Sequence, residues 1–186
     1  MKTFIATGIA AASLVSAASA DITLTLNGAT FAGFNFFTFV DYAAGEQVVG
    51  TLTGAVVNAT LDSSVAYTYS DDLCVYVDVE PLGFGGKLQI GGFSNLGAAQ
   101  RYSWPNGASS APGTVTSGSV SLTSSLVFTG DKAVDGTIWI GNGYGAAGTS
   151  GTWTGTVTLV GVSVVPAPGA LALLGIAGFA SRRRRA

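Results

Sequence analysis

The chain has 186 residues, of which 48% are hydrophobic and 10% charged, and it contains one cysteine and no histidine. This composition excludes a Ser-His-Asp triad, a Cys-His pair and any histidine-containing zinc site, and a lone cysteine forms neither an internal disulfide nor a thiolate cage. Five of the eight basic residues lie in the terminal segments, so residues 21–164 hold three basic and ten acidic residues, a formal charge of −7. This acidic body has no basic patch for nucleic acid or anionic lipid.

The first twenty residues have the three-part layout of a secretory signal peptide. Lys2 supplies a positive charge, residues 4–15 form an apolar stretch, and Ala18-Ser19-Ala20 provides a small-residue cleavage site. The apolar stretch is shorter than the roughly 20 residues that a membrane-spanning helix needs. We therefore expect export through the Sec translocon and cleavage between Ala20 and Asp21.

Residues 21–164 are predicted to form one all-β domain, because alternating apolar and polar runs are separated by Gly, Asn and Ser turns. No segment shows convincing helical periodicity. In chain order, the predicted strands cover residues 21–26, 31–40, 47–57, 64–70, 73–79, 87–90, 113–128 (as more than one strand), 137–140 and 152–164. Residues 101–113 are predicted to be a loop, and the glycine-rich residues 140–153 a long hairpin loop.

Two of these strands have clearly separated faces. In residues 73–80, one face of the strand is apolar and carries Leu73, Val75, Val77 and Val79. The opposite face carries Cys74, Tyr76, Asp78 and Glu80. In residues 152–159, Trp153, Val157 and Leu159 share a face opposite four threonines. Because side chains alternate along a strand, each strand has one face for a core and one for water. We therefore predict an antiparallel β-sandwich or jelly roll, in which Cys74 is a part-buried strand residue.

Two segments of this body resemble a known family. They are residues 71–92 (DDLCVYVDVEPLGFGGKLQIGG) and residues 148–163 (GTSGTWTGTVTLVGVS), in which Gly151-Thr152-Trp153-Thr154 leads into the last strand. Together they are similar to the P-domain-like β-sandwich of proprotein convertases. The resemblance implies an accessory, non-catalytic module and transfers no site residue.

Carboxylates are the remaining candidates for catalysis. Asp78 and Glu80 share a strand face with Cα atoms about 6.5–7 Å apart, a separation that a glycosidase pair could use. Any acidic pair at this spacing on a solvated strand has the same geometry. A solvated acidic face is therefore the favoured interpretation, and no catalytic residue is assigned.

Loop carboxylates could also bind calcium. Asp71 with Asp72, or Asp131 with Asp135, offer the hard oxygen ligands that Ca²⁺ prefers. The second pair lacks the alternating ligands and the terminal glutamate of an EF-hand. No other metal or cofactor is expected.

Aromatic side chains offer a second kind of binding site, because an exposed ring can stack on a sugar. Trp104, Trp139 and Tyr144 are the candidates for such stacking. Trp153 and most of the phenylalanines in residues 31–39 are instead expected to pack in the core or between strands.

The C-terminal segment has three parts in a fixed order. Val165-Pro166-Ala167-Pro168-Gly169 breaks the incoming strand, residues 169–180 are small and apolar, and Arg182, Arg183, Arg184 and Arg185 form a basic block. Twelve apolar residues reach only about 18 Å as a helix, less than the roughly 30 Å hydrocarbon core. Such a helix could be held in a membrane transiently, with the arginine block on the cytoplasmic side.

This segment resembles the PEP-CTERM sorting signal of exported proteins of Gram-negative bacteria. The order Val-Pro-x-Pro-Gly, apolar helix and terminal arginine cluster carries the resemblance, while Ala167 replaces the usual glutamate of that signal. The resemblance implies recognition near residues 166–169 by exosortase, a membrane transpeptidase-like enzyme, after transient insertion in the inner membrane. It further implies removal of the tail and a role at the cell surface or in an extracellular matrix with exopolysaccharide.

The sequence thus favours a non-enzymatic exported protein of the cell surface or the extracellular (biofilm) matrix. One alternative is a calcium-stabilised carbohydrate-binding or adhesion module, and a less favoured one is a glycan-active hydrolase. A thermal midpoint that calcium does not change would argue against the first alternative.

Both ends of the exported protein are therefore predicted to be cut. Mass spectrometry of the released protein is expected to find a chain that begins at Asp21 and ends near Pro166. Released protein that still carries residues 182–185 would contradict processing of the tail.

Overall fold

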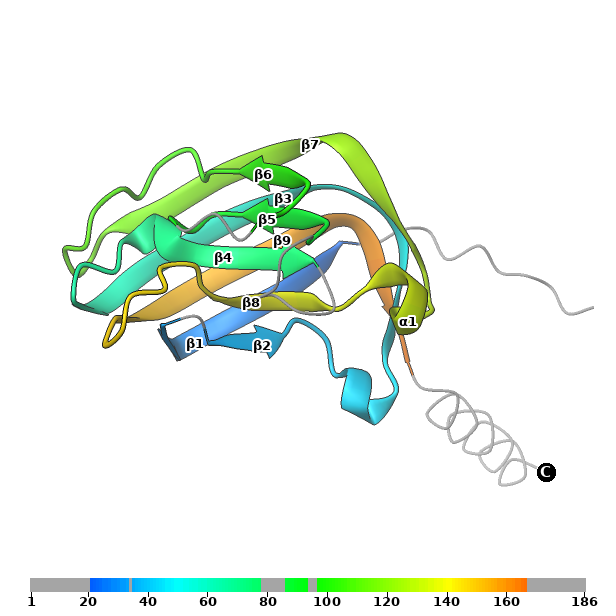
Figure 1. The fold of residues 1–186 in the computed structure, drawn as a ribbon, viewed down its shortest axis with the longest axis horizontal. Helices are drawn as coiled ribbons and strands as arrows, with labels where there is room; N and C mark the ends of the chain where they lie inside the picture. The colour runs from blue at the N-terminus through cyan, green and yellow to red at the C-terminus, as the bar shows by residue number, and fades with distance from the viewer. Residues whose placement is uncertain (1–20, 34, 78–85, 94–96, 167–186) are drawn as a thin grey trace, which may run out of the picture.

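The computed structural model describes residues 21–33, 35–77, 86–93 and 97–166. These residues form two β-sheets that lie face to face, with two short 3-10 turns and one short helix at the periphery (Figure 1). The predicted all-β sandwich is confirmed at this level. The predicted signal peptide and the apolar C-terminal helix lie outside the described residues. No helix within the described ranges is long and apolar enough to cross a membrane.

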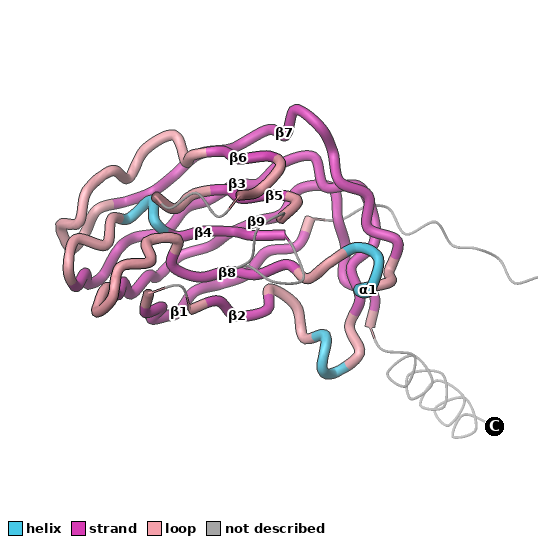
Figure 2. Tube along the Cα trace, in the orientation of Figure 1, coloured by secondary structure: helices cyan, strands magenta, loops and turns pink. Residues whose placement is uncertain are grey.

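The first sheet has four long strands (Figure 2). Each is antiparallel to its neighbours. Its order is β1 (Ile22–Ala32), β9 (Ser150–Val165), β3 (Gln47–Val65) and β7 (Val115–Thr129). The separate strand predicted over residues 64–70 is wrong, because β3 runs on from the predicted strand 47–57 to Val65 and residues 66–70 form a turn and the start of a 3-10 turn. The segment predicted as more than one strand over residues 113–128 is the single strand β7. The long strands continue through local shifts in pairing register, such as the one between Leu52 and Gly54 in β3.

The second sheet has five short strands. Its order is β2 (Phe36–Thr38), β8 (Ile138–Asn142), β4 (Leu73–Val77), β5 (Leu88–Ile90) and β6 (Gln100–Tyr102). β5 and β6 are parallel, so this sheet is not purely antiparallel as predicted. β6 begins one residue before the predicted loop over residues 101–113 and includes its first two residues, because three residues are too few to show an alternating pattern.

The glycine-rich segment after β8 is not a hairpin loop. β8 belongs to the five-stranded sheet and β9 to the four-stranded sheet, so the residues between Asn142 and Ser150 cross from one sheet to the other. The predicted hairpin is therefore wrong, although the segment is a loop. The crossing places Tyr144 at the end of the sandwich rather than beside β9.

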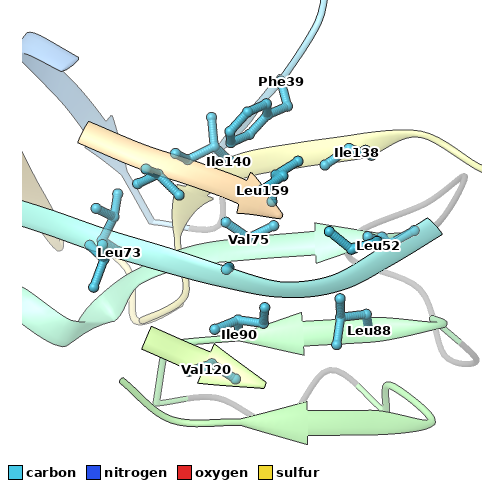
Figure 3. Packing of buried hydrophobic residues seen from close by; sticks show 14 of the residues in the cluster. Phe39, Leu52, Leu73, Val75, Leu88, Ile90, Val120, Ile138, Ile140 and Leu159 are labelled. Atoms are coloured by element: carbon cyan, nitrogen blue, oxygen red, sulfur yellow. The ribbon is translucent and has the colours of Figure 1, made fainter. Parts of the chain in front are cut away.

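The core lies between the two sheets (Figure 3). Leu52 and Leu159 of the four-stranded sheet face Val75, Ile138 and Ile140 of the five-stranded sheet in this view. On β9, the predicted inner face is confirmed, since the side chains of Trp153, Val157 and Leu159 are fully buried. The opposite face carries hydroxyl pairs between strands, including Thr23 with Thr158 and Thr30 with Thr152, each at 2.8 Å between Oγ1 atoms.

β4 departs from the predicted division into a core face and a water face. All five of its residues are buried, including Cys74 and Tyr76 on the face away from the core. Gly143 lies so close to Cys74 that a Cβ there would be 3.0 Å from the cysteine Cβ, and Gly86 lies still closer to the Tyr76 ring. Backbone from two loops therefore covers this face, and burial raises the pKa of the Cys74 thiol.

One helical turn also lies outside the sequence prediction. α1 (Lys132–Asp135) begins at Asp131, whose side chain accepts a hydrogen bond from the Ala133 N–H. Four residues are too few to show helical periodicity. The turn closes the end of the molecule opposite the start of β4, as Figure 1 shows.

Truncation of Trp153 tests the core. We expect Trp153→Ala to lower the free energy of unfolding by about 3–5 kcal/mol, because it removes a fully buried indole and leaves a cavity. Denaturant unfolding measures this change. Val127→Ala removes an exposed side chain of β7 and is the control, with an expected change within about 0.5 kcal/mol. Similar losses in the two variants would contradict the assigned core.

Candidate functional site

A shallow hollow lies at the end of the sandwich where β4 begins and β8 ends. It has a volume of about 190 Å³ and is lined by four aromatic residues and one carboxylate, namely Tyr67, Tyr69, Phe93, Tyr144 and Asp72. The residues come from the turn after β3, the 3-10 turn η2 (Ser70–Asp72), the segment after β5 and the β8–β9 connection. We call Tyr67, Tyr69, Phe93 and Tyr144 the aromatic half of the site.

A second hollow of about 250 Å³ adjoins the first and shares Tyr69, Asp72 and Phe93 with it. We call its polar lining, Asp71, Asp72, Arg101 and Ser103, the polar half. Each hollow is smaller than the roughly 300–1,000 Å³ of an enclosed small-molecule pocket. Because they share three residues, the two hollows adjoin, and we call them together the end groove.

The aromatic half begins with a strained turn that exposes Tyr67. Ala66 and Tyr67 have φ angles of 52° and 64°, in the left-handed region that residues other than glycine rarely adopt. Two hydrogen bonds hold the turn, from Thr68 Oγ1 to the Val65 carbonyl (3.1 Å) and from Ser64 Oγ to the Thr68 carbonyl (2.7 Å). The Tyr67 side chain is 77% exposed. Strained backbone of this kind gathers at binding sites, where it holds a side chain in place for a ligand.

Phe93 and Tyr144 form the other wall of the aromatic half. Their ring centroids are 5.9 Å apart in an edge-to-face arrangement. Arg101 fixes the Phe93 backbone, because its Nη2 donates to the carbonyls of Gly92 (3.1 Å) and Phe93 (2.8 Å). The Tyr144 N–H donates to Asn142 Oδ1 at 2.9 Å. Both rings thus stand on backbone that hydrogen bonds hold in place.

Asp72 connects the walls of the groove. Its Oδ2 accepts the Tyr69 N–H at 2.7 Å, and its carboxylate also accepts the Phe93 N–H. Its backbone carbonyl accepts the Gly143 N–H at 2.7 Å, next to Tyr144. One residue therefore links the segments that carry three of the four rings.

The Asp72 side chain is only 4% exposed. Burial raises the pKa of its carboxyl to about 6, and the negative charge of Asp71 adds to this rise, while the N–H groups of Tyr69 and Phe93 oppose it. Burial also raises the pKa of Asp71.

Three of the side chains that the sequence singled out meet in the end groove. They are Asp71 and Asp72, predicted as calcium ligands, and Tyr144, predicted to stack on sugar. The prediction that Trp104 is an exposed ring for sugar stacking is wrong, because the residue is buried and donates its Nε1–H to the Leu73 carbonyl at 2.6 Å. Trp139 lies half-buried on β8, opposite Tyr76.

The second predicted calcium pair has structural partners. The Asp135 carboxylate accepts hydrogen bonds from the N–H groups of Thr129, Gly130 and Asp131 and from Thr129 Oγ1, while Asp131 begins α1. Among residues 21–33, 35–77, 86–93 and 97–166, no three acidic or cysteine side chains gather as a metal-binding group. Calcium binding stays a prediction.

The remaining predicted residues lie mostly outside the described ranges. These are Asp78 and Glu80, the cleavage residue Ala20, and the tail residues Ala167, Pro168, Gly169 and the arginine block. Val165 ends β9 and Pro166 follows it, exposed. The Asp21 carboxylate accepts the Gly161 N–H at 2.9 Å, so the expected first residue of the exported chain is attached to β9.

Sequence reasoning missed five side chains of the end groove: Tyr67, Tyr69, Phe93, Arg101 and Ser103. A local signal exists for two of them, since Tyr67-Thr-Tyr69 directly precedes the acidic pair after a predicted strand. Phe93 and Arg101 have no such signal. They reach the groove only because β5 and β6 place their segments beside η2.

The fold and the groove together define an all-β sandwich with an aromatic and acidic cleft at one end. Comparison of the chain with family models, with curated proteins and with solved structures found no match.

The raised pKa of Asp72 predicts a pH dependence of stability. Between the unfolded pKa of about 3.9 and the folded pKa of about 6, the folded protein binds more protons at this carboxyl than the unfolded chain. The contribution of Asp72 to the free energy of unfolding therefore falls as pH rises through this window.

Denaturant unfolding of the wild type and of Asp72→Asn at constant ionic strength measures this contribution. The stability of the wild type relative to Asp72→Asn is expected to decline from pH 4 to pH 6.5, because the amide cannot ionise. Asp62→Asn controls for the loss of one negative charge elsewhere. Parallel curves for wild type and Asp72→Asn would contradict the raised pKa.

Proposed function

We propose that the protein is a non-enzymatic, exported protein of the cell surface or extracellular matrix, whose sandwich binds carbohydrate in the end groove. The observation that carries this proposal is the set of aromatic rings around a buried carboxylate. Tyr67 and Phe93, at 77% and 75%, are the most exposed of the large hydrophobic side chains in the described residues. Exposed rings gathered at one hollow are typical of a binding site.

The chemistry of the groove matches that of a sugar. The C–H faces of a pyranose ring are apolar and pack on aromatic faces, whereas its hydroxyl edge needs hydrogen-bond partners. The end groove offers both kinds of surface within one cleft, with rings in the aromatic half and carboxylates in the polar half. Ionised carboxylates only accept hydrogen bonds, and sugar hydroxyls donate them.

The N- and C-terminal segments of the sequence support export to the cell surface or extracellular matrix. The N-terminal segment has the layout of a signal peptide, and the C-terminal segment resembles the PEP-CTERM sorting signal. In this proposal the Sec translocon and exosortase are partners during export, and an exopolysaccharide is the partner afterwards. The mature body, with few charges and many Gly, Ser and Thr residues, suits a hydrated polysaccharide matrix.

Asp72 favours a second candidate function. A buried carboxyl with a pKa of about 6 resembles the general acid of a glycosidase. The two functions differ in outcome, because a hydrolase releases new reducing ends from a polysaccharide and a binding module does not. Reducing-end release that Asp72→Asn abolishes would replace binding by hydrolysis as the function.

Loss of the exposed rings tests carbohydrate binding. In affinity electrophoresis or calorimetry with a polysaccharide panel, we expect Tyr67→Ala and Phe93→Ala each to weaken binding about 5- to 30-fold. Each variant removes a ring from the groove without touching the buried core. Val127→Ala removes a similarly exposed apolar side chain at the far end of the four-stranded sheet and is expected to bind as the wild type does.

Two results would contradict this function. One is that the purified protein binds no polysaccharide of the panel. The other is that both ring variants bind as tightly as Val127→Ala.

A further inference from the structure

We propose that the end groove selects uncharged glycans and excludes polymers of uronic acids, and that Asp71 and Asp72 are the residues that determine this specificity. The inference rests on the proposed function, since it names the class of ligand for the same groove. It goes further because a carbohydrate-binding groove could equally favour acidic matrix polymers.

The geometry brings ring substituents close to the carboxylates. Asp72 lines both hollows, and Tyr69 and Phe93 also belong to both. A sugar stacked in the aromatic half therefore has Asp72 at its edge, and the next sugar along the chain lies in the polar half beside Asp71. A uronic acid carries its carboxylate on the ring, so a polymer of uronic acids places negative charges beside these two residues.

The charged groups around Asp72 do not neutralise the negative charge of its carboxylate. The titratable and charged groups near it are Asp71 on η2, Arg101 on β6, the phenols of Tyr67, Tyr69 and Tyr144, and the thiol of Cys74 on β4. The phenols are uncharged, and burial raises the pKa of the Cys74 thiol, so it is uncharged too. Two carboxylates and one guanidinium remain, which leaves the groove net negative at neutral pH.

Arg101 supplies one positive charge to the groove lining, where the two carboxylates outnumber it. Its Nη2 donates to the Gly92 and Phe93 carbonyls and so supports the Phe93 ring. The Asp72 carboxylate, in contrast, is held in the groove by the Tyr69 N–H and cannot turn away from a ligand without losing that bond. A like charge brought against a fixed, buried carboxylate is disfavoured far more than one in open water.

The same groups accommodate a neutral sugar. A carboxylate has about four acceptor positions, and the two backbone N–H groups of Tyr69 and Phe93 leave positions on Asp72 for sugar hydroxyls. Asp71 adds a second, half-buried acceptor. An uncharged glycan therefore donates hydroxyls to both residues without electrostatic repulsion.

A matched pair of ligands isolates charge from shape. The probes are polygalacturonate and alginate, each beside its own carboxyl-reduced form, which has the same linkages and no charge. Affinity is measured by calorimetry at pH 8 and pH 5, at one ionic strength. At pH 8 the wild type is expected to bind at least one carboxyl-reduced polymer, and to bind it at least about tenfold more tightly than the acidic parent.

Two variants and a control assign this difference to the groove. Asp71→Asn and Asp72→Asn are expected to narrow the difference in affinity between the carboxyl-reduced polymer and its acidic parent. Each substitution removes one negative charge and keeps a carbonyl acceptor. Asp62→Asn removes the same charge from the outer face of the four-stranded sheet, where Asp62 accepts the Thr154 hydroxyl at 2.6 Å, and is expected to keep the difference. Lowering the pH to 5 is expected to narrow this affinity difference in the wild type, since Asp72 then gains a proton while the exposed uronate stays ionised.

The possible results separate the two proposals. Equal affinity of the wild type for the acidic and reduced polymers overturns the selection of neutral glycans and leaves carbohydrate binding intact. If Asp62→Asn narrows the affinity difference between reduced and acidic polymers as much as Asp71→Asn does, the role of the groove carboxylates is overturned. Failure to bind any of the four polymers counts against both proposals. If Asp72→Asn does not fold, Asp71→Asn and the two pH values still decide the outcome.

Discussion

The hydrogen bond from Trp153 Nε1 to the Ser70 carbonyl, 3.0 Å long, is the contact on which the rest of the structure depends. The indole is fully buried between the sheets and packs against Phe31, with ring centroids 5.9 Å apart. Its polar N–H needs a partner in this apolar setting. The partner is the first residue of η2, the turn that carries Asp71 and Asp72. The core of the sandwich thereby sets the position of the groove.

Other bonds fasten the same turn to the four-stranded sheet. The Thr116 hydroxyl of β7 donates to Ser70 Oγ at 2.7 Å, and Ser70 Oγ donates to the Thr114 carbonyl at 3.1 Å. Ser70 is fully buried, and so is Thr116. A polar network inside the protein is rigid when all of its members have partners. The carboxylate that connects the groove walls thus stands on a fixed base, and the walls gain a defined spacing from it.

The sequence predicted the fold class and several core faces well. Trp153, Val157 and Leu159 alternate with threonines, and this period-2 pattern correctly placed them in the core. It failed for β4, where Cys74 and Tyr76 are as buried as Val75, because backbone near Gly86 and Gly143 covers a face that alternation assigns to water. The prediction of Trp104 as an exposed stacking ring was also wrong, because Trp104 packs in the core and donates to the Leu73 carbonyl.

The sequence by itself determined the all-β class, the acidic and histidine-free chemistry, and the inner face of β9, since composition and alternation are local properties of the chain. It also identified Asp71, Asp72 and Tyr144 as residues of interest. Only the tertiary structure decided that these residues share one groove with Tyr67, Phe93 and Arg101. Residues 67 and 144 are far apart in the chain, and no local pattern records that β4, β5 and β8 bring their ends together. Strand order is set by packing of whole sheets, and the groove is a product of that order.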